Sequence, residues 1–535
     1  MTSVHLQGRP ASPGFASGPL VILAQGPAAS RRPIDDASSE TAALRAAITK
    51  ANSELVEIAT KLTGEAREMI AFQSALLDDP AMSEAALDAI AQGDPADQAW
   101  RQALDQEIAG YEASEDEYFR ARASDLADIR DRVLRHLSGE AAPVIAAGSV
   151  VLAEDLTPSM FLGTDWRDGG IALTNGSPTS HVAMLARARG VPMVVGVDNG
   201  IAGLTPGTAA MLDGAVGSLV LAPGARDLAE FERRRSTARA ESRAAAAVVK
   251  QPAVTADGAR IAVLLNIADP AELDDLDPEI CDGIGLVRTE LLFSGNALPD
   301  EDAQAAVYTR IAVWAAGRPV TIRTLDAGGD KPIRGLTLEG EVNPFLGVRG
   351  IRLMLRRRDV FKTQLRALAR AAVVGKIEIM LPMVAVPREV EETRSLLAEA
   401  CAELAREGVP HRSPPLGIMV EVPAVAIAPE RFAADFFSIG SNDLVQYALA
   451  AGRDVASLAD VATAADPAVL RLIANVTHHG RLHARKVSIC GDAGGDPALI
   501  PLLLDAGLRC FSMAPSQVGR AKLAIAAYGR DARAP

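Results

Sequence analysis

The pattern of apolar and polar residues changes twice in the first half of the chain. Near the N-terminus, short apolar runs alternate with Gly and Pro, which is typical of short β-strands joined by turns. From Ser38 onward, apolar residues recur at helical spacing over about a hundred residues, enough for a four-helix bundle. Strand-like runs return at SVVLAE, GIALTN and PMVVGV. We therefore predict an α/β domain interrupted by an inserted helical bundle.

The segment 227–250 is rich in Ala, Arg and Glu and nearly free of large apolar residues. Such a composition makes a poor core helix and a good semi-rigid helical connector. At about 1.5 Å per residue, a helix of this length spans on the order of 30 Å. We expect this segment to link two domains and to act as a hinge.

Beyond the connector, eight apolar, β-branched runs alternate with helical patterns over about 270 residues, which predicts a (β/α)₈ barrel. The runs are IAVLLN, DGIGLVR, PVTIRTLD, KIEIMLP, LGIMVEV, FFSIGS, KVSICG and RCFSMA. The predicted fold class is therefore α/β and multi-domain. The predicted boundaries are an α/β domain at 1–25 plus 141–225, a helical insertion at 26–140, a helical linker at 226–250 and a barrel at 251–535.

Composition narrows the possible partners. The 535 residues carry a net charge of −14, which disfavours binding to nucleic acids or anionic membranes. Four cysteines without a CxxC pair exclude a disulfide scaffold and a Cys-type zinc site. No apolar stretch approaches the roughly 20 residues needed to span a bilayer, and no secretory signal is visible. We expect a cytoplasmic protein with no membrane insertion.

The string GSPTSHVAMLARARGVP (176–192) predicts a helix capped by Thr179 or Ser180 and ended by Gly190. His181 would lie in the first turn of that helix. There the helix dipole disfavours imidazolium and stabilises an attached anionic phosphoryl group. The alternative interpretation is a surface histidine beside a helix cap.

Polar side chains cluster at or just after the ends of the predicted barrel strands, where barrel active sites lie. Arg288, Arg323 and Arg349 indicate an anionic ligand, since guanidinium groups bind phosphate and carboxylate bidentately. The alternative for each arginine is a surface salt bridge. Glu421 and Asp443 suggest a Mg²⁺ site, with a plain buried ion pair as the alternative.

Asn442 and Arg453 are placed to hold a second anionic group of the same ligand. Cys490, at the end of the seventh strand, is either a small buried apolar residue or a general acid. We interpret the remaining cysteines as packing residues and the histidines before the seventh strand as surface residues; these are Cys281, Cys401, Cys510, His478, His479 and His483.

The chain resembles the enzyme I family of the phosphoenolpyruvate-dependent sugar phosphotransferase system, over nearly its full length. The resemblance rests on ASPGFASGP, DEYFRARASDLADIRDRVLRHL, TSHVAMLARARGVP, GIGLVRTELLF, IRTLDAGGDK, NPFLGVRGIR, GIMVEVPAVA, FFSIGSNDLVQY and CGDAGG.

The resemblance implies a function. The enzyme would transfer the phosphoryl group of phosphoenolpyruvate to its own histidine and then to a histidine of an HPr-like phosphocarrier protein, releasing pyruvate. The insertion would dock the carrier, and the barrel would bind phosphoenolpyruvate and form a homodimer. The implied residues are His181 as the phosphohistidine, Arg288, Arg323, Arg453 and Asn442 as phosphoenolpyruvate ligands, Glu421 and Asp443 as Mg²⁺ ligands, and Cys490 as the proton donor. Arg349 and Asp443 join the expected phosphoenolpyruvate-binding set.

Three positions depart from the family pattern. Ser177-Pro178 replaces a usual Gly-Gly before the TSH motif, Asp492 replaces a usual Glu after Cys490, and the bundle lacks a His near Gln73. Two alternative functions are weighed. One is a pyruvate phosphate dikinase-like or phosphoenolpyruvate synthase-like enzyme without its ATP domain, and the other is a non-catalytic regulator that senses phosphoenolpyruvate. His181, Cys490 and the carboxylates argue against a pure sensor, which needs no acid.

Overall fold

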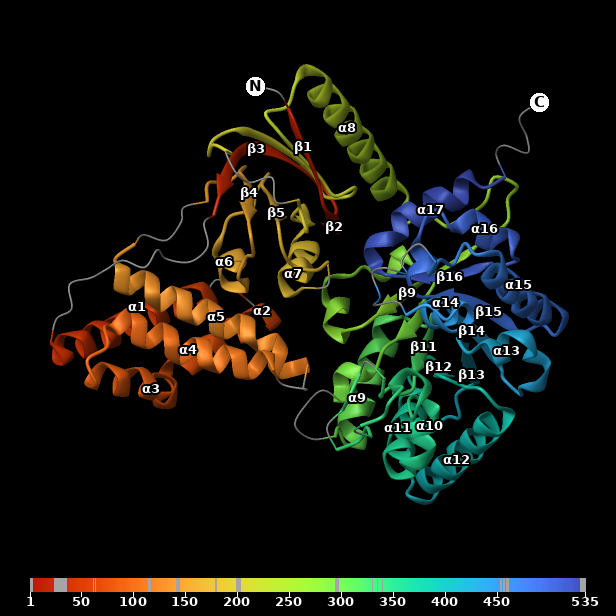
Figure 1. The fold of residues 1–535 in the computed structure, drawn as a ribbon. Coiled ribbons are helices and arrows are strands. Elements are labelled where there is room, and N and C mark those ends of the chain that lie inside the picture. Colours follow the sequence, from red (N-terminus) through yellow and green to blue (C-terminus); the bar gives the residue numbers. More distant parts are fainter. Residues whose placement is uncertain are drawn as a thin grey trace. The chain divides into compact units, whose positions relative to one another are not determined.

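The computed structural model divides the chain into two compact units, Met1–Thr237 and Ala238–Pro535. The structure describes residues 3–23, 36–60, 62, 64–113, 117–140, 145–178, 180–198, 204–293, 298–329, 331–333, 335–338, 340–452, 455, 458 and 461–529. The expected fold class is confirmed: an α/β chain with several helices in its first half and a closed parallel barrel in its second half (Figure 1).

The first unit contains an eight-stranded sheet whose neighbours run in the order β1-β8-β7-β3-β4-β5-β6-β2. The stretch β3-β4-β5-β6 is parallel and the remaining pairs are antiparallel. Every residue of β4 and β5 is buried, which explains their continuous apolar runs. The strands are β1 Val4–Gln7, β2 Arg9–Ser12, β3 Phe15–Ile22, β4 Val150–Ala153, β5 Gly170–Leu173, β6 Met193–Val195, β7 Ala209–Asp213 and β8 Ser218–Leu221, and the short helices that follow β4 and β5 are α6 Pro158–Gly163 and α7 His181–Arg189.

The described part of the helical insertion holds five helices, one more than the simplest bundle. Asp79 caps the third of them by accepting a hydrogen bond from the backbone of Ala81, and Pro80 occupies the first helical position. The proline therefore divides one apolar stretch into two helices. The helices are α1 Ala37–Thr60, α2 Gly64–Asp78, α3 Pro80–Ala91, α4 Ala96–Glu112 and α5 Glu117–Ser138. The sequence also predicts a capping box of Ser114 and Glu117 at the start of the last of these helices, and Ser114 lies outside the described residues.

Gln73, near which the family often carries a His that this chain lacks, is fully buried within the bundle. Its side-chain amide donates to Asp125 at 2.9 Å and to Asp128 at 3.3 Å. Gln73 therefore presents no surface to a partner and instead joins α2 to α5.

The expected connector forms one helix, α8 Ala225–Val248. Its first half packs on the sheet, where Phe231 meets Phe15 edge-on with ring centroids 5.5 Å apart. Its second half packs on α17 (Val518–Ala527), where a Cβ at Gly519 would lie 2.6 Å from the carbonyl oxygen of Ala245. Residues 239–244, between these two contacts, are all exposed. The helix is thus anchored at both ends and unpacked in the middle.

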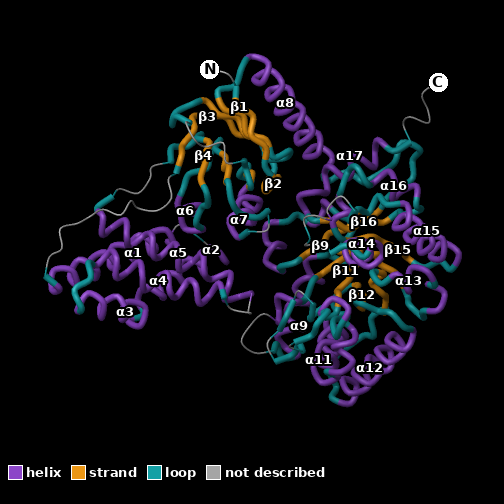
Figure 2. The backbone as a smooth tube through the Cα atoms, in the orientation of Figure 1, coloured by secondary structure: helices purple, strands orange, loops and turns teal. Residues whose placement is uncertain are grey.

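In the second unit all eight predicted strands pair in parallel and close into a barrel, in the order β10-β11-β12-β13-β14-β15-β16-β9. The strands lie together in the middle of this unit, with helices around them (Figure 2). The strands are β9 Ala262–Ile267, β10 Ile284–Val287, β11 Pro319–Arg323, β12 Lys376–Leu381, β13 Leu416–Val420, β14 Phe436–Gly440, β15 Lys486–Cys490 and β16 Cys510–Met513. The remaining helices of this unit are α9 Glu301–Trp314, α10 Ile351–Arg356, α11 Arg358–Ala371, α12 Pro387–Arg406, α13 Pro423–Ile427, α14 Ser441–Leu449, α15 Pro467–Leu482 and α16 Ile500–Asp505.

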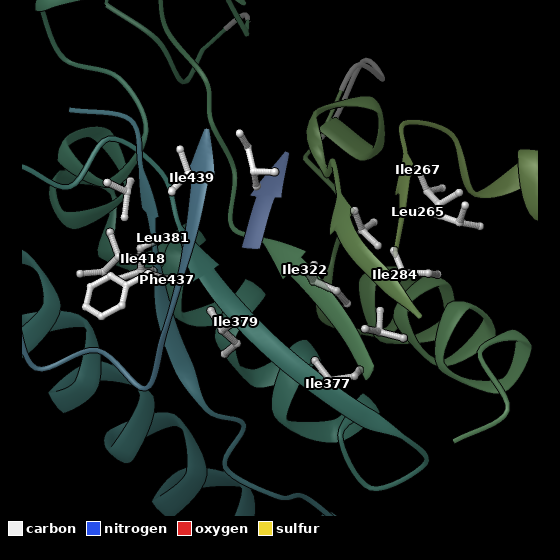
Figure 3. Packing of buried hydrophobic residues seen from close by; sticks show 14 of the residues in the cluster. Leu265, Ile267, Ile284, Ile322, Ile377, Ile379, Leu381, Ile418, Phe437 and Ile439 are labelled. Carbon is white, nitrogen blue, oxygen red and sulfur yellow. The ribbon is translucent and has the colours of Figure 1, made fainter. Parts of the chain in front are cut away.

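Alternate residues of the barrel strands join two different clusters, as the period of two requires. One set packs against the surrounding helices in a single large cluster that includes Ile322, Ile379, Ile418 and Phe437 (Figure 3). The other set forms a small separate cluster of Leu286, Met380, Met419, Phe436 and Cys490. The second set lies inside the barrel, where the polar site residues also begin. No described helix is long and apolar enough to cross a membrane.

Candidate active site

The candidate site is built by residues that end the parallel strands or follow them directly. Arg323 is the last residue of β11 and Cys490 the last of β15, while Glu421 directly follows β13. Asn442 and Asp443 lie in the first turn of α14, which begins where β14 ends. Because parallel strands end on one side of the barrel, these side chains share its C-terminal mouth.

Asp326 is the centre of a buried charge network at this mouth. Its side chain is fully buried and accepts hydrogen bonds from Arg349, whose Nη2 lies 3.0 Å from Oδ2. Arg323 Nη1 and Lys331 Nζ lie 3.2 Å and 3.1 Å from the same oxygen. Burial alone would raise the pKa of Asp326, but the three cations hold it below its ordinary value. Asp326 therefore stays ionised and organises the arginines around it.

Arg323 is fixed by a second carboxylate that the motif analysis did not single out. Its Nη2 donates to Glu290 Oε1 at 2.7 Å, and the same oxygen accepts the backbone N–H of Asp326 at 3.1 Å. Glu290 lies in the RTELLF motif two residues after Arg288, and its place just after a strand-end arginine is the signal that could have identified it. The surface salt bridge weighed for Arg323 is wrong, because its side chain is only 5% exposed.

Arg349 is fully buried, so the surface alternative is wrong for this residue as well. Besides Asp326, its Nη1 reaches Asp443 Oδ1 at 3.4 Å and the Tyr447 hydroxyl at 3.3 Å. The Tyr447 hydroxyl in turn donates to the carbonyl of Phe345 at 2.6 Å. These contacts make Arg349 a brace for Asp443, and its direct contact with substrate stays a prediction.

Arg288 differs from the other two arginines because its side chain is exposed. It follows β10, and its backbone N–H donates to Ile267 at 2.9 Å, which extends the strand pairing by one residue. Burial raises the pKa of Cys490, and the positive charge of Arg288 lies close enough to oppose that rise weakly. Among the described arginines predicted to bind the ligand, Arg288 is therefore the one whose side chain is exposed to solvent.

Glu421 and Asp443 are the described carboxylates that could hold a divalent cation. Glu421 is 1% exposed, and its Oε1 accepts the backbone N–H of Met383 at 2.6 Å. Burial, together with the negative charges of Asp443 and Asp326, raises the pKa of Glu421 to about 8 against the opposing effect of Arg323. A Cβ at Gly440 would lie 3.0 Å from Glu421 Oε2, so glycine leaves this oxygen open.

The carboxylates of Glu421 and Asp443 are hard oxygen donors and fit Mg²⁺, which takes one or two carboxylates and fills its remaining positions with water and substrate. Among the described residues no group of three or more His, Cys, Asp or Glu side chains forms a complete cage for a metal. A site of two carboxylates would therefore leave most coordination positions to water and a ligand.

Cys490 is buried among the residues inside the barrel and is 2% exposed. Its Sγ lies 3.8 Å from the Ser438 hydroxyl and 3.5 Å from the carbonyl oxygen of Ile439. Burial raises the pKa of the thiol to about 11, which outweighs the opposing effect of Ser438. The side chain therefore carries a proton at neutral pH, as a general acid must.

Asn442 is tied to Asp492, the residue that departs from the family pattern. The amide of Asn442 donates to Asp492 Oδ2 at 3.1 Å and accepts the Asp492 backbone N–H at 3.0 Å. Gly491 lies between them at φ +87°, where a Cβ would come within 2.6 Å of Asn442 Oδ1. The shorter Asp492 side chain still reaches Asn442 and orients it at the mouth.

The helix that carries His181 begins and ends as the sequence predicts. Ser180 caps it by accepting the backbone N–H of Ala183 at 3.3 Å, and Gly190 ends it at φ +66°. The preceding loop is pinned by Arg187, whose Nη1 donates to the carbonyls of Pro178 at 2.7 Å and Ala11 at 2.6 Å. Thr179, Arg453 and the side chain of His181 lie outside what the structure describes, so their predicted roles stay predictions.

The family models and the curated relatives that match the chain agree on one family. Models of the PEP-utilising enzyme family match three regions: the PEP-binding domain at 242–529, the N-terminal domain at 7–122 and the mobile domain at 145–217. A phosphoenolpyruvate-protein phosphotransferase of Geobacillus stearothermophilus is 40% identical over 436 residues, covering 80% of this chain and 75% of that protein.

A multiphosphoryl transfer protein of Rhodobacter capsulatus is 40% identical over 460 residues, covering 84% of this chain and 55% of that protein. Among solved structures, an NMR solution structure of an enzyme I protein (nEIt) covers 44% of this chain and 99% of its own, with 27% identity and a TM-score of 0.38.

Proposed function

The chain belongs to the PEP-utilising, phosphoenolpyruvate–protein phosphotransferase family, and from that premise we propose that it carries phosphate from phosphoenolpyruvate to a carrier protein. The phosphoryl group passes first to His181 and then to a histidine of an HPr-like phosphocarrier, and pyruvate is released. The names of the relatives favour this transfer over the dikinase-like and sensor alternatives.

The observation that carries the proposal is a protonated acid beside a set of fixed cations. Cys490 keeps its proton at neutral pH, while Arg323 is held in place by Glu290 and Asp326. A sensor needs the cations to bind an anion, but it has no use for a buried proton donor at the same mouth. The pairing of both features indicates chemistry on the bound anion.

In the proposed first step, phosphoenolpyruvate binds at the mouth with its phosphate on Arg288 and Arg323 and its carboxylate near Asn442 and Arg453. A neutral imidazole nitrogen of His181 attacks phosphorus, and the bond from phosphorus to the enol oxygen breaks. Fixed positive groups stabilise the charge on the phosphoryl oxygens, since positioning and electrostatics dominate phosphoryl transfer.

In the second step, Cys490 gives its proton to the methylene carbon of enolpyruvate, which forms pyruvate and leaves a thiolate. Solvent returns a proton to that thiolate because its pKa is far above neutral. We propose Glu421 and Asp443 as the residues that hold Mg²⁺, which would supply further positive charge to the phosphate. Phospho-His181 then transfers its group to the carrier docked on the helical insertion.

We further propose that the enzyme acts in the cytoplasm, as a homodimer through the barrel, in the first step of a phosphotransferase system for sugar transport. The test is incubation of the full chain with ³²P-phosphoenolpyruvate and Mg²⁺, with His181→Ala as the control. Acid-labile label on the wild type and none on the variant is the expected result. A wild-type chain that took no label would refute the enzymatic proposal and leave the sensor alternative standing.

A further inference from the structure

A second polar surface lies on the outside of the barrel, away from the candidate active site. Helix α15 and the turn that precedes β16 border an open hollow of about 410 Å³. Arg481 precedes β15 and Asp505–Gly507 precede β16, so the hollow lies toward the N-terminal ends of these strands, whereas the active-site residues lie at the C-terminal ends. The hollow is lined by Arg471, Ala474, Asn475, Thr477, His478, Arg481, Asp505, Ala506 and Gly507.

The charge of this surface is opposite to that of the whole chain. The charged residues of the lining are Arg471, Arg481 and Asp505, two positive charges against one negative, and the sequence between Asp466 and Asp492 has no acidic residue. Arg485 and Lys486 of the same segment do not line the hollow and pair with Asp435 and Glu378 at 4.0 Å and 2.6 Å. The protein as a whole carries −14. A local positive surface on a strongly acidic protein indicates a site for a negatively charged ligand.

Three cationic or hydrogen-bond-donating side chains line the hollow from one face of α15. Arg471, His478 and Arg481 are all exposed, and their spacing of seven and three residues places them along one side of the helix. Neither Arg471 nor Arg481 forms an ion pair with a carboxylate in the described part of the chain. Their guanidinium groups are therefore open to an anion.

His478 is oriented by its neighbour. Arg481 Nη2 lies 3.1 Å from His478 Nδ1, and a guanidinium can only donate, so Nδ1 is the acceptor. The proton of the neutral ring therefore resides on Nε2, which is left as a further N–H donor. Two guanidinium groups and an imidazole N–H in one hollow match the several acceptor oxygens of a phosphate group.

The wall formed by the turn before β16 is fixed. The Thr477 hydroxyl donates to the carbonyl of Ala506 at 2.5 Å, and Gly507, at φ +93°, would place a Cβ 2.9 Å from that hydroxyl. Asp505, the one acidic residue of the lining, accepts the Tyr528 hydroxyl at 2.5 Å. The volume is within the range of small-molecule sites.

We propose that this hollow, lined by Arg471, His478 and Arg481, is a second anion site that binds the phosphate group of a small phosphorylated metabolite. The site does not depend on the proposed catalytic function, because none of its residues belongs to the mouth of the barrel. Its ligand meets the two guanidinium groups and His478 Nε2–H, while the Thr477–Ala506 contact holds the floor in place.

The test uses the full-length chain labelled with ¹³C in its histidine rings, with His478→Gln to assign the signal of His478. Inorganic phosphate is titrated at constant ionic strength set by chloride. We expect a saturable shift of the His478 signal in the wild type and at least a tenfold weaker response in the double variant Arg471→Gln/Arg481→Gln. The control is Arg358→Gln/Arg406→Gln, which removes two exposed arginines outside the hollow and should titrate like the wild type.

Phosphate also has a place to bind at the barrel mouth, but the His478 signal reports only the local site. A linear, non-saturating shift, or equal affinity in the double variant, would overturn the proposal as non-specific ion screening. A shift that depended on protein concentration without phosphate would also overturn it, since a second copy of the chain would then fill the hollow. All four arginines are exposed, so thermal melts of the variants are expected to match the wild type.

Discussion

The two units of this chain hold their functional groups by different means. At the barrel mouth, buried charges fix the side chains: Asp326 holds Arg323, Arg349 and Lys331 within 3.2 Å of one oxygen. In the first unit, hydrogen bonds to the backbone hold the helix that carries His181. Ser180 caps the helix of His181, and Arg187 pins the preceding loop through two carbonyl oxygens.

The difference follows from what each site is proposed to do. A mouth that binds one small anion benefits from side chains already locked in place, since no reorganisation is then needed at the moment of reaction. A histidine that must meet both phosphoenolpyruvate and a carrier protein needs a rigid base and an open side. A capped helix terminus supplies the rigid base.

The largest effect is expected when the first unit is produced without the barrel. We predict that a fragment of residues 1–237 folds and exchanges phosphate reversibly with its phosphorylated carrier, but takes none from phosphoenolpyruvate. Every residue assigned to phosphoenolpyruvate lies beyond 250, and Phe231 and Arg234, at the start of α8, pack on the sheet of this unit. Radiolabel transfer in each direction measures the effect, with the full-length His181→Ala variant expected to fail in both.

Direct labelling of this fragment by phosphoenolpyruvate would show that the barrel is not the substrate site. A folded fragment that refused phosphate from every phosphorylated carrier would show that the helical insertion does not dock the carrier.

The next largest effect concerns the acid of the mouth. Cys490→Ala should reduce phosphoryl flux from phosphoenolpyruvate by about 10²–10⁴-fold, because a positioned general acid contributes that much. Exchange between phospho-His181 and the carrier should be unchanged, since that half-reaction needs no enolpyruvate. Cys510→Ala is the matched control, because Cys510 is also buried but begins β16 instead of ending a strand. Equal flux in both variants would remove Cys490 from the mechanism.

The barrel was predictable from sequence because its strands are continuous apolar runs, each ended by a polar residue such as Arg323, Glu421 or Cys490. What the sequence could not supply was the partner of each charge. Asp326 and Arg349 are 23 residues apart, and Asp443 lies nearly a hundred residues from Arg349, so only the closed barrel brings them together. The five-helix insertion was underestimated because one apolar pattern crosses Asp79-Pro80.

Removing the buried charge of Asp326 should lower the free energy of unfolding more than removing a carboxylate at the surface. Asp326→Asn leaves Arg323, Arg349 and Lys331 with an uncompensated positive charge, and breaking a buried pair costs about 3–5 kcal/mol. The free energy of unfolding of the barrel, measured by urea denaturation, should fall by that amount. Asp302→Asn, which removes an exposed partner of Arg370 at 2.7 Å, is the control and should cost at most about 1 kcal/mol. Similar losses in both variants would contradict a network held by buried charge.

A smaller effect is expected where the connector meets the first unit. Phe231→Ala should destabilise that unit by about 3 kcal/mol, the usual cost of truncating a well-buried phenylalanine. Leu228→Ala, on the same helix but 47% exposed, should cost far less. Urea denaturation of the 1–237 fragment measures both changes, and the barrel activity of the full chain should be unaffected. Equal stabilities of the two variants would mean that the first half of α8 is not anchored on the sheet.

The smallest expected effect concerns pH: the ability of Cys490 to act as an acid should not change between pH 6 and 9. Burial raises the pKa of Cys490 from an ordinary 9.0 to about 11, so the folded protein keeps this proton where the unfolded chain loses it. The thiol should therefore remain a competent acid from pH 6 to 9, and alkylation of Cys490 by iodoacetamide in the folded chain should stay slow until the pH approaches 11. Because the folded state binds this proton more tightly than the unfolded state, its contribution to stability is complete below about pH 9 and declines as the pH rises toward 11.

Mass spectrometry of the alkylated peptide measures the rate at which Cys490 is alkylated, with the urea-unfolded chain as the control that should react readily near pH 9. Rapid alkylation of the folded chain at pH 8 would mean that the thiol is already ionised, and the proposed proton donor would have to be another group.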